Sequence, residues 1–205
     1  MKIPRRAALG SRVGAVAATI AATLGCSVVK SSRIRDDWQQ VDRQRVKRLV
    51  VVTSPLPDGN ERVAEMWSAI AARHVDLKRD FIIKDKMARG GGAMETRSLC
   101  GAGIEGVLWL APDVKRAGNG IEAAVDEKLV RCADGEEVWS ARAAGSWESF
   151  ESGLQQTIQD YTAQFGTEVQ PYVAASYHLL RAALDTLPNP VLTEEDQTDK
   201  IENSQ

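Results

Sequence analysis

The chain has few of the side chains that metal sites and nucleophilic catalysis use most often. Its 205 residues include two histidines and three cysteines. Zinc sites hold such residues in closely spaced pairs, whereas His74, Cys100, Cys132 and His178 are far apart in the sequence. The G-x-S-x-G motif is missing, and no Gly-Lys-Ser/Thr follows Gly90-Gly91-Gly92, as a phosphate-binding loop requires. We therefore expect no enzyme, no catalytic residue, no metal, no cofactor and no small-molecule substrate.

The apolar stretch near the start of the chain is short. Val13 to Gly25 is uncharged and has 13 residues, whereas a helix that crosses a bilayer needs about 20. The basic residues Lys2, Arg5 and Arg6 precede it, and small residues end it. A basic head, a short apolar run and a small-residue cleavage site are typical of a secretory signal peptide. We predict that residues 1–25 are such a peptide.

The residues around Cys26 carry a family resemblance. Leu24-Gly25-Cys26 ends the apolar run and resembles the lipobox of bacterial lipoproteins, although Thr23 and Leu24 depart from its usual pattern. The resemblance implies that the signal peptide is cut off just before Cys26, and that Cys26 is acylated and anchors the protein in a membrane. Ser27, which is not Asp, resembles the signal for outer-membrane delivery; the inner membrane, facing the periplasm, is the alternative. An ordinary secreted protein whose signal happens to end near a cysteine is the other interpretation.

The charge distribution argues against nucleic acid as a partner. Without residues 1–25 the formal net charge changes from −2 to −6, and no basic stripe with interleaved aromatic residues is present. Residues 26–45 are polar and predict a lipidated N-terminus and tether, whose basic residues either contact anionic headgroups or are simply solvated. Residues 46–190 fit one periplasmic α/β domain. Residues 191–205 are acidic and predict a disordered tail.

Hydrophobic patterning predicts the elements of this domain. β-branched runs with turn residues between them favour strands, apolar residues three and four apart favour helices, and Asn60 is a candidate N-cap. Asp134-Gly135 is a strong hairpin signal. We expect strands over 46–53, from Phe81, over 106–111, 121–132 and 136–143; helices over 61–75, over 93–100 and after Gly145, with a break at Gly166; and a loop over 112–120.

This order predicts an α/β (α+β) fold. A helix between the first two strands implies a crossover, and the last three strands imply an antiparallel meander. We expect a mixed sheet of about five strands with a crossover helix and long C-terminal helices packed on it. The strand Gly106 to Ala111 and the hairpin Ala133 to Ser140 resemble those of the curli-secretion, penicillin-binding-protein-activator and TolB amino-terminal-like domains. The whole chain is also similar to an envelope lipoprotein family of myxobacterial type.

The cysteines and one tryptophan suggest two further sites, a disulfide and a contact with a partner. An exported chain with two cysteines besides Cys26 favours a disulfide between Cys100 and Cys132. A hairpin centred on Arg116 would place both thiols at the same end, since opposed residue numbers would sum to 232. Trp147, beyond the last strand, is either core or an exposed anchor for a partner.

These observations lead to two main hypotheses for the function, and a hydrolase is a third that ranks last. The first is a non-enzymatic, lipid-anchored envelope protein that binds or scaffolds a periplasmic or outer-membrane component, with an envelope protein as its partner. The second is an activator or assembly factor for a cell-wall synthase or secretion channel, and it rests on the resemblance of fold alone.

Overall fold

The computed structural model describes residues 28–90 and 93–203. Within these residues the chain forms a six-stranded mixed sheet with the strand order β1-β6-β5-β4-β2-β3. The strands are β1 (Val29–Ile34), β2 (Arg48–Thr53), β3 (Ile82–Ala88), β4 (Gly106–Ala117), β5 (Gly120–Arg131) and β6 (Glu137–Glu148). The helices are α1 (Glu61–Lys78), α2 (Ala93–Leu99), α3 (Gln155–Phe165), α4 (Val173–Leu184) and α5 (Glu194–Asn203), with short 3₁₀ helices at Asp42–Gln44, Ser152–Leu154 and Thr167–Tyr172.

The expected fold class is confirmed. β2 pairs in parallel with β3 and with β4, and the other strand pairs are antiparallel. The crossover between β2 and β3 is α1, and Asn60 caps it by accepting a hydrogen bond from the Val63 amide at 3.2 Å. The Asp134-Gly135 turn is also as expected, because Gly135 has φ +79° and links the antiparallel strands β5 and β6.

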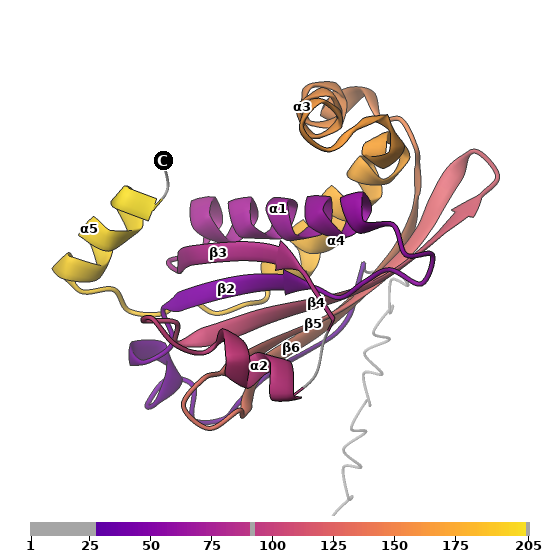
Figure 1. Ribbon diagram of the computed structural model, residues 1–205. Helices are drawn as coiled ribbons and strands as arrows, with labels where there is room; N and C mark the ends of the chain where they lie inside the picture. The colour runs from indigo at the N-terminus through magenta and orange to yellow at the C-terminus, as the bar shows by residue number, and fades with distance from the viewer. Residues whose placement is uncertain (1–27, 91–92, 204–205) are drawn as a thin grey trace, which may run out of the picture.

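Two hydrophobic layers flank the sheet. α1 and α4 lie over one face, with α3 beyond them, whereas α2 lies on the opposite side (Figure 1). Leu49 and Val51 of β2 belong to the large core beneath α1 and α4. Val50 and Val52 belong to a smaller cluster that includes Leu99 of α2. β2 is therefore buried on both faces, which explains why its sequence is almost continuously apolar.

The prediction of a loop over residues 112–120 is wrong. β4 continues through Pro112 to Ala117, and the chain turns at Gly118 and Asn119. Proline is tolerated here because β2 has already ended. The Leu110 carbonyl accepts a hydrogen bond from the Ser54 amide, just after β2. The Pro112 nitrogen, two residues further along β4, points to the same side, where no strand remains to pair with it. β6 likewise extends past Gly145 to Glu148 before the C-terminal helices begin.

The prediction of a tether over residues 26–45 is also wrong for residues 28–45, which are the part of it that the structure describes. Val29–Ile34 pairs with β6 as an edge strand, and Trp38 is only 1% exposed. Asp42 is fully buried and forms an ion pair with Arg131 at the end of β5. β1 has no apolar alternation because most of its side chains are exposed, so its sequence resembles a linker.

The disordered tail expected over 191–205 is not what the structure shows. Residues Glu194–Asn203 form α5. Asp196 is buried, and it forms ion pairs with Lys47 and Arg48. The acidic composition of this segment predicted disorder, but its Asp196 is paired with basic residues about 150 positions earlier in the chain.

Candidate partner-binding face

Within the part of the chain that the structure describes, half of the sheet has no helix over one of its faces. Along β5, odd-numbered residues such as Val125 and Leu129 pack in the core beneath the helices, whereas Asp126 and Lys128 point the opposite way and are exposed. The strand pairing extends this surface across four neighbouring strands, β1, β6, β5 and β4. We call it the open face, and it consists of two cross-strand rows: Ser31, Arg142, Asp126 and Ala111; and Arg33, Ser140, Lys128 and Trp109.

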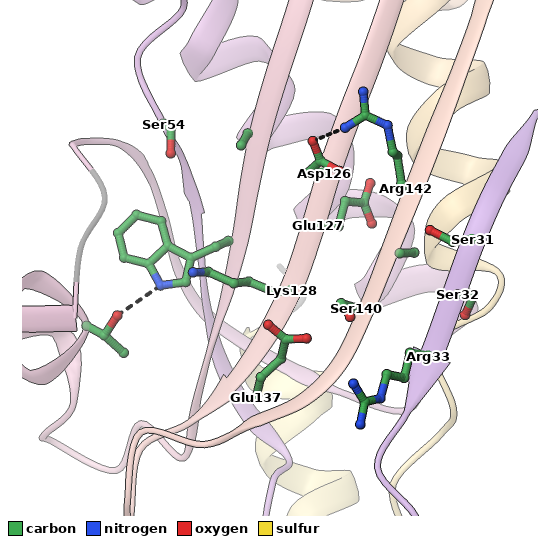
Figure 2. A pocket seen from close by; sticks show the side chains of 14 residues that line it. Ser31, Ser32, Arg33, Ser54, Asp126, Glu127, Lys128, Glu137, Ser140 and Arg142 are labelled. Atoms are coloured by element: carbon green, nitrogen blue, oxygen red, sulfur yellow. Dashed lines mark hydrogen bonds and ion pairs between the residues drawn. The ribbon is translucent and has the colours of Figure 1, made fainter.

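A hollow of about 470 Å³ lies on the open face. Figure 2 shows Ser31, Ser32 and Arg33 along one side, on β1. Trp109 of β4 and Thr96 of α2 also line the hollow. The Trp109 indole nitrogen donates to Thr96 Oγ1 of α2 at 3.1 Å, and the residue is only 4% exposed. Trp109 therefore fixes α2 as a wall of the hollow rather than offering its ring for stacking.

The charges in the hollow are only partly paired. Asp126 and Arg142 form an ion pair across β5 and β6 (Figure 2). Among the described residues, Lys128 and Arg33 have no hydrogen-bonded or ion-paired side-chain partner, and Ser140 lies between them in the same row. Glu137 also lines the hollow (Figure 2). Cations and a carboxylate left without fixed partners can engage polar or charged groups of a partner at little structural cost.

The sequence did not single out these residues. The signal for them was present in the strand expected over 121–132, where Glu122, Ala124 and Asp126 alternate with Ile121, Ala123 and Val125. Such alternation indicates a strand with one solvated face. Which of the strands would share that face could not be deduced without the sheet order.

The structure pairs Cys100 with Cys132, and their Cα atoms are 5.4 Å apart. The register argument for this disulfide is wrong, however. In the hairpin, Gly106 opposes Arg131 and Ala117 opposes Gly120, so Cys100 lies outside the strand pairing. The bond instead links the end of α2 to the end of β5, and so it holds α2 over the smaller hydrophobic cluster.

Cys26 lies outside the described residues, so its lipidation stays a prediction. Among the residues that are described, we find no helix with the length and apolarity needed to cross a membrane. Trp147 is partly buried: it packs against the large core, and its ring stacks on His178 with centroids 6.0 Å apart. A role for Trp147 as a partner anchor also stays a prediction.

Both histidines are turned towards carboxylates. His178 Nε2 lies 2.7 Å from Glu151, and His74 Nε2 lies 3.1 Å from Asp185. Burial lowers the pKa of His74, which is opposed by the hydrogen bond to Asp185. Within residues 28–90 and 93–203 no group of histidine, cysteine or acidic residues is arranged to hold a metal ion.

Comparisons with known proteins give likenesses to solved structures only. No family model and no curated protein matches the sequence. The chain is similar to a PelC dodecamer from Paraburkholderia phytofirmans, with 17% identity, a TM-score of 0.46 and coverage of 71% of this chain and 91% of that one. It is also similar to lipoprotein GNA1162 from Neisseria meningitidis, with 16% identity, a TM-score of 0.34 and coverage of 58% and 96%. Protein XCC0632 from Xanthomonas campestris, of family DUF330, matches at 14% identity and a TM-score of 0.36, over 70% and 87% of the two chains. Likenesses this low carry no argument about function.

Proposed function

We propose that this chain is a non-enzymatic, lipid-anchored envelope protein that binds an envelope component across the open face. The observation that carries the proposal is the hollow between α2 and β1, where Lys128 and Arg33 flank Ser140. The lipobox-like Cys26 supports a lipid anchor, and Ser27, which is not Asp, supports the outer membrane as its location, with the domain in the periplasm. The disulfide supports an oxidising compartment.

The geometry of the open face favours protein binding over catalysis. Its polar side chains come from three strands of a rigid sheet and present both signs of charge. A surface of this kind selects partners by charge complementarity and influences association rate more than it influences affinity. Neither histidine lines the hollow.

In-cell photocrosslinking tests this proposal. A photoreactive amino acid in place of Ser140, on the floor of the hollow, should give a discrete adduct with one envelope protein. The matched control is the same substitution at Arg62, which is exposed on α1, and it should give no such adduct. Adding the substitutions K128E and R33E should reduce the adduct at residue 140 at least tenfold.

The outcome also distinguishes the two functional hypotheses. Mass spectrometry that identifies a synthase or a secretion-channel subunit would favour the activator or assembly role. An adduct with another envelope protein would favour the scaffold. Equal crosslinking from residues 140 and 62 would show that the open face is not a binding site.

A further inference from the structure

The C-terminal helix α5 has almost no apolar means of attachment. Asp196 is its only buried residue, at 4% exposure, and Ile201 is 67% exposed. An isolated helix of this length is marginal in water, and a polar helix gains little from hydrophobic packing. α5 must therefore be held in place chiefly by its charged contacts.

Lys200 of α5 donates to the Arg79 carbonyl oxygen. The ion pairs of Asp196 and Asp199 converge instead on three cations, which we call the basic site: Lys47, Arg48 and Lys84. Asp196 binds Lys47 at 2.6 Å and Arg48 at 2.8 Å. Asp199, three residues on in the same helix, binds Arg48 at 2.9 Å and Lys84 at 2.5 Å. The site thus recognises two carboxylates on one face of a helix, about one turn apart.

The basic site is also positioned by a residue outside α5. One carboxylate oxygen of Glu105 accepts hydrogen bonds from the amides of Lys47 and Arg48 at 2.8 and 2.9 Å, and the other lies 3.4 Å from the Arg48 guanidinium. Lys84 belongs to β3 and Arg48 to β2, which pair in the sheet. The three cations would therefore stay together if α5 moved away, and they would carry an excess of positive charge.

We propose that α5 is a detachable cover and that the basic site it occupies binds an acidic helical segment of a partner protein. Charge complementarity and the spacing of Asp196 and Asp199 define that segment: two carboxylates three residues apart on a polar helix. The basic site shares no residue with the open face, so this proposal is independent of the proposed function.

Both aspartates stay ionised at neutral pH, as this recognition requires. Burial alone would raise the pKa of Asp196, but the hydrogen bond from Lys47 and those from Thr193 outweigh it and lower that pKa below its usual value. The hydrogen bond from Lys84 lowers the pKa of Asp199, and burial opposes it only in part.

Hydrogen–deuterium exchange of the full chain tests whether α5 detaches. The double substitution D196N and D199N should accelerate amide exchange in α5 at least tenfold and leave β2 unchanged. E194Q with E195Q, which alters exposed acids of the same helix, is the matched control and should have no comparable effect. Unchanged exchange in the D196N and D199N chain would overturn the proposal.

Peptide binding tests the vacated site. A fluorescent peptide with the sequence of residues 192–205 should bind the D196N and D199N chain at least tenfold more tightly than the unmodified chain, in which α5 competes. The same peptide with both aspartates replaced by asparagine should not bind. Failure of the acidic peptide to bind the opened chain would contradict the proposal, and so would tighter binding to anionic phosphatidylglycerol vesicles than to the peptide. Far-UV circular dichroism confirms that the variants remain folded.

Discussion

At the scale of single residues, Glu127 is at odds with its surroundings. It lies on β5 opposite Leu110 and Ala141 on the helix-covered side of the sheet, and it is 2% exposed. Neither carboxylate oxygen has a hydrogen-bond partner among the described residues. Burial raises the pKa of this carboxyl group well above its usual value, so the protonated form is favoured in the folded protein.

This burial makes stability depend on pH. Because the pKa of Glu127 is raised on folding, its unfavourable contribution is absent below the unfolded pKa of about 4.3 and grows as the pH rises towards the folded value. The substitution Glu127→Gln should remove a slope of up to about 1.4 kcal/mol per pH unit, so the variant's advantage in unfolding free energy should increase from pH 5 to pH 8. Urea denaturation measures it, with E122Q, exposed on the same strand, as the control. Parallel pH profiles for the E127Q variant and the unmodified chain would contradict the prediction.

Among the elements, α2 depends most on a covalent bond. It has seven residues and covers part of a small hydrophobic cluster on β2, β4 and β5. The disulfide joins the residue that follows α2 to the residue that follows β5, over a sequence separation of 32. A short helix with so little apolar contact is among the first segments to open when its tether is cut.

Removing this bond should therefore destabilise the fold and loosen α2 first. The paired substitution C100S and C132S should lower the unfolding free energy by about 3–4 kcal/mol, because the loop of about 30 residues is no longer closed in the unfolded chain. Amide exchange in α2 should rise more than in α1. Alkylation of the unmodified protein without reductant should label neither cysteine, and full labelling of either would show that the bond does not form in cells.

The hairpin of β4 and β5 requires glycine just after its turn. A Cβ atom at Gly120 would lie 2.5 Å from the Trp147 carbonyl oxygen on β6, and that backbone atom cannot rotate away. We expect Gly120→Ala to lower the unfolding free energy by about 1–3 kcal/mol through overpacking. Gly153→Ala, where the nearest atom is 3.9 Å away, should have a much smaller effect in the same denaturation assay; equal losses would rule out this close approach.

At the scale of the whole molecule, no helix of the described residues covers one broad face of the sheet. α1 and α4 bury the large core, and α2 covers the opposite side of β2 and β4 (Figure 1). β1 and β6 continue the sheet beyond α2, where the side chains are polar. A domain held near a membrane could thus present a rigid polar surface without any rearrangement of its core.

Anchoring should depend on Cys26 alone. The substitution C26S should move the protein from the membrane fraction to the soluble periplasmic fraction, because three acyl chains make dissociation negligible whereas no acyl chain remains in the variant. Fractionation measures this, and metabolic labelling with a palmitate analogue should mark only the unmodified protein. The unfolding free energy should not change. A serine variant that still sediments with membranes, or a wild type that takes up no label, would contradict the lipoprotein interpretation.

The sequence alone determined the features that depend on local patterning. β2, α1 with its Asn60 cap, and the Asp134-Gly135 turn were all predictable, because apolar periodicity, capping and positive φ act over a few residues. Only the tertiary structure decided the roles of β1, α5 and Glu127. Ser32 meets Thr186 and Arg48 meets Asp199, so polar segments are ordered by contacts more than 140 residues away. The open face likewise depends on where the helices pack, which no single strand encodes.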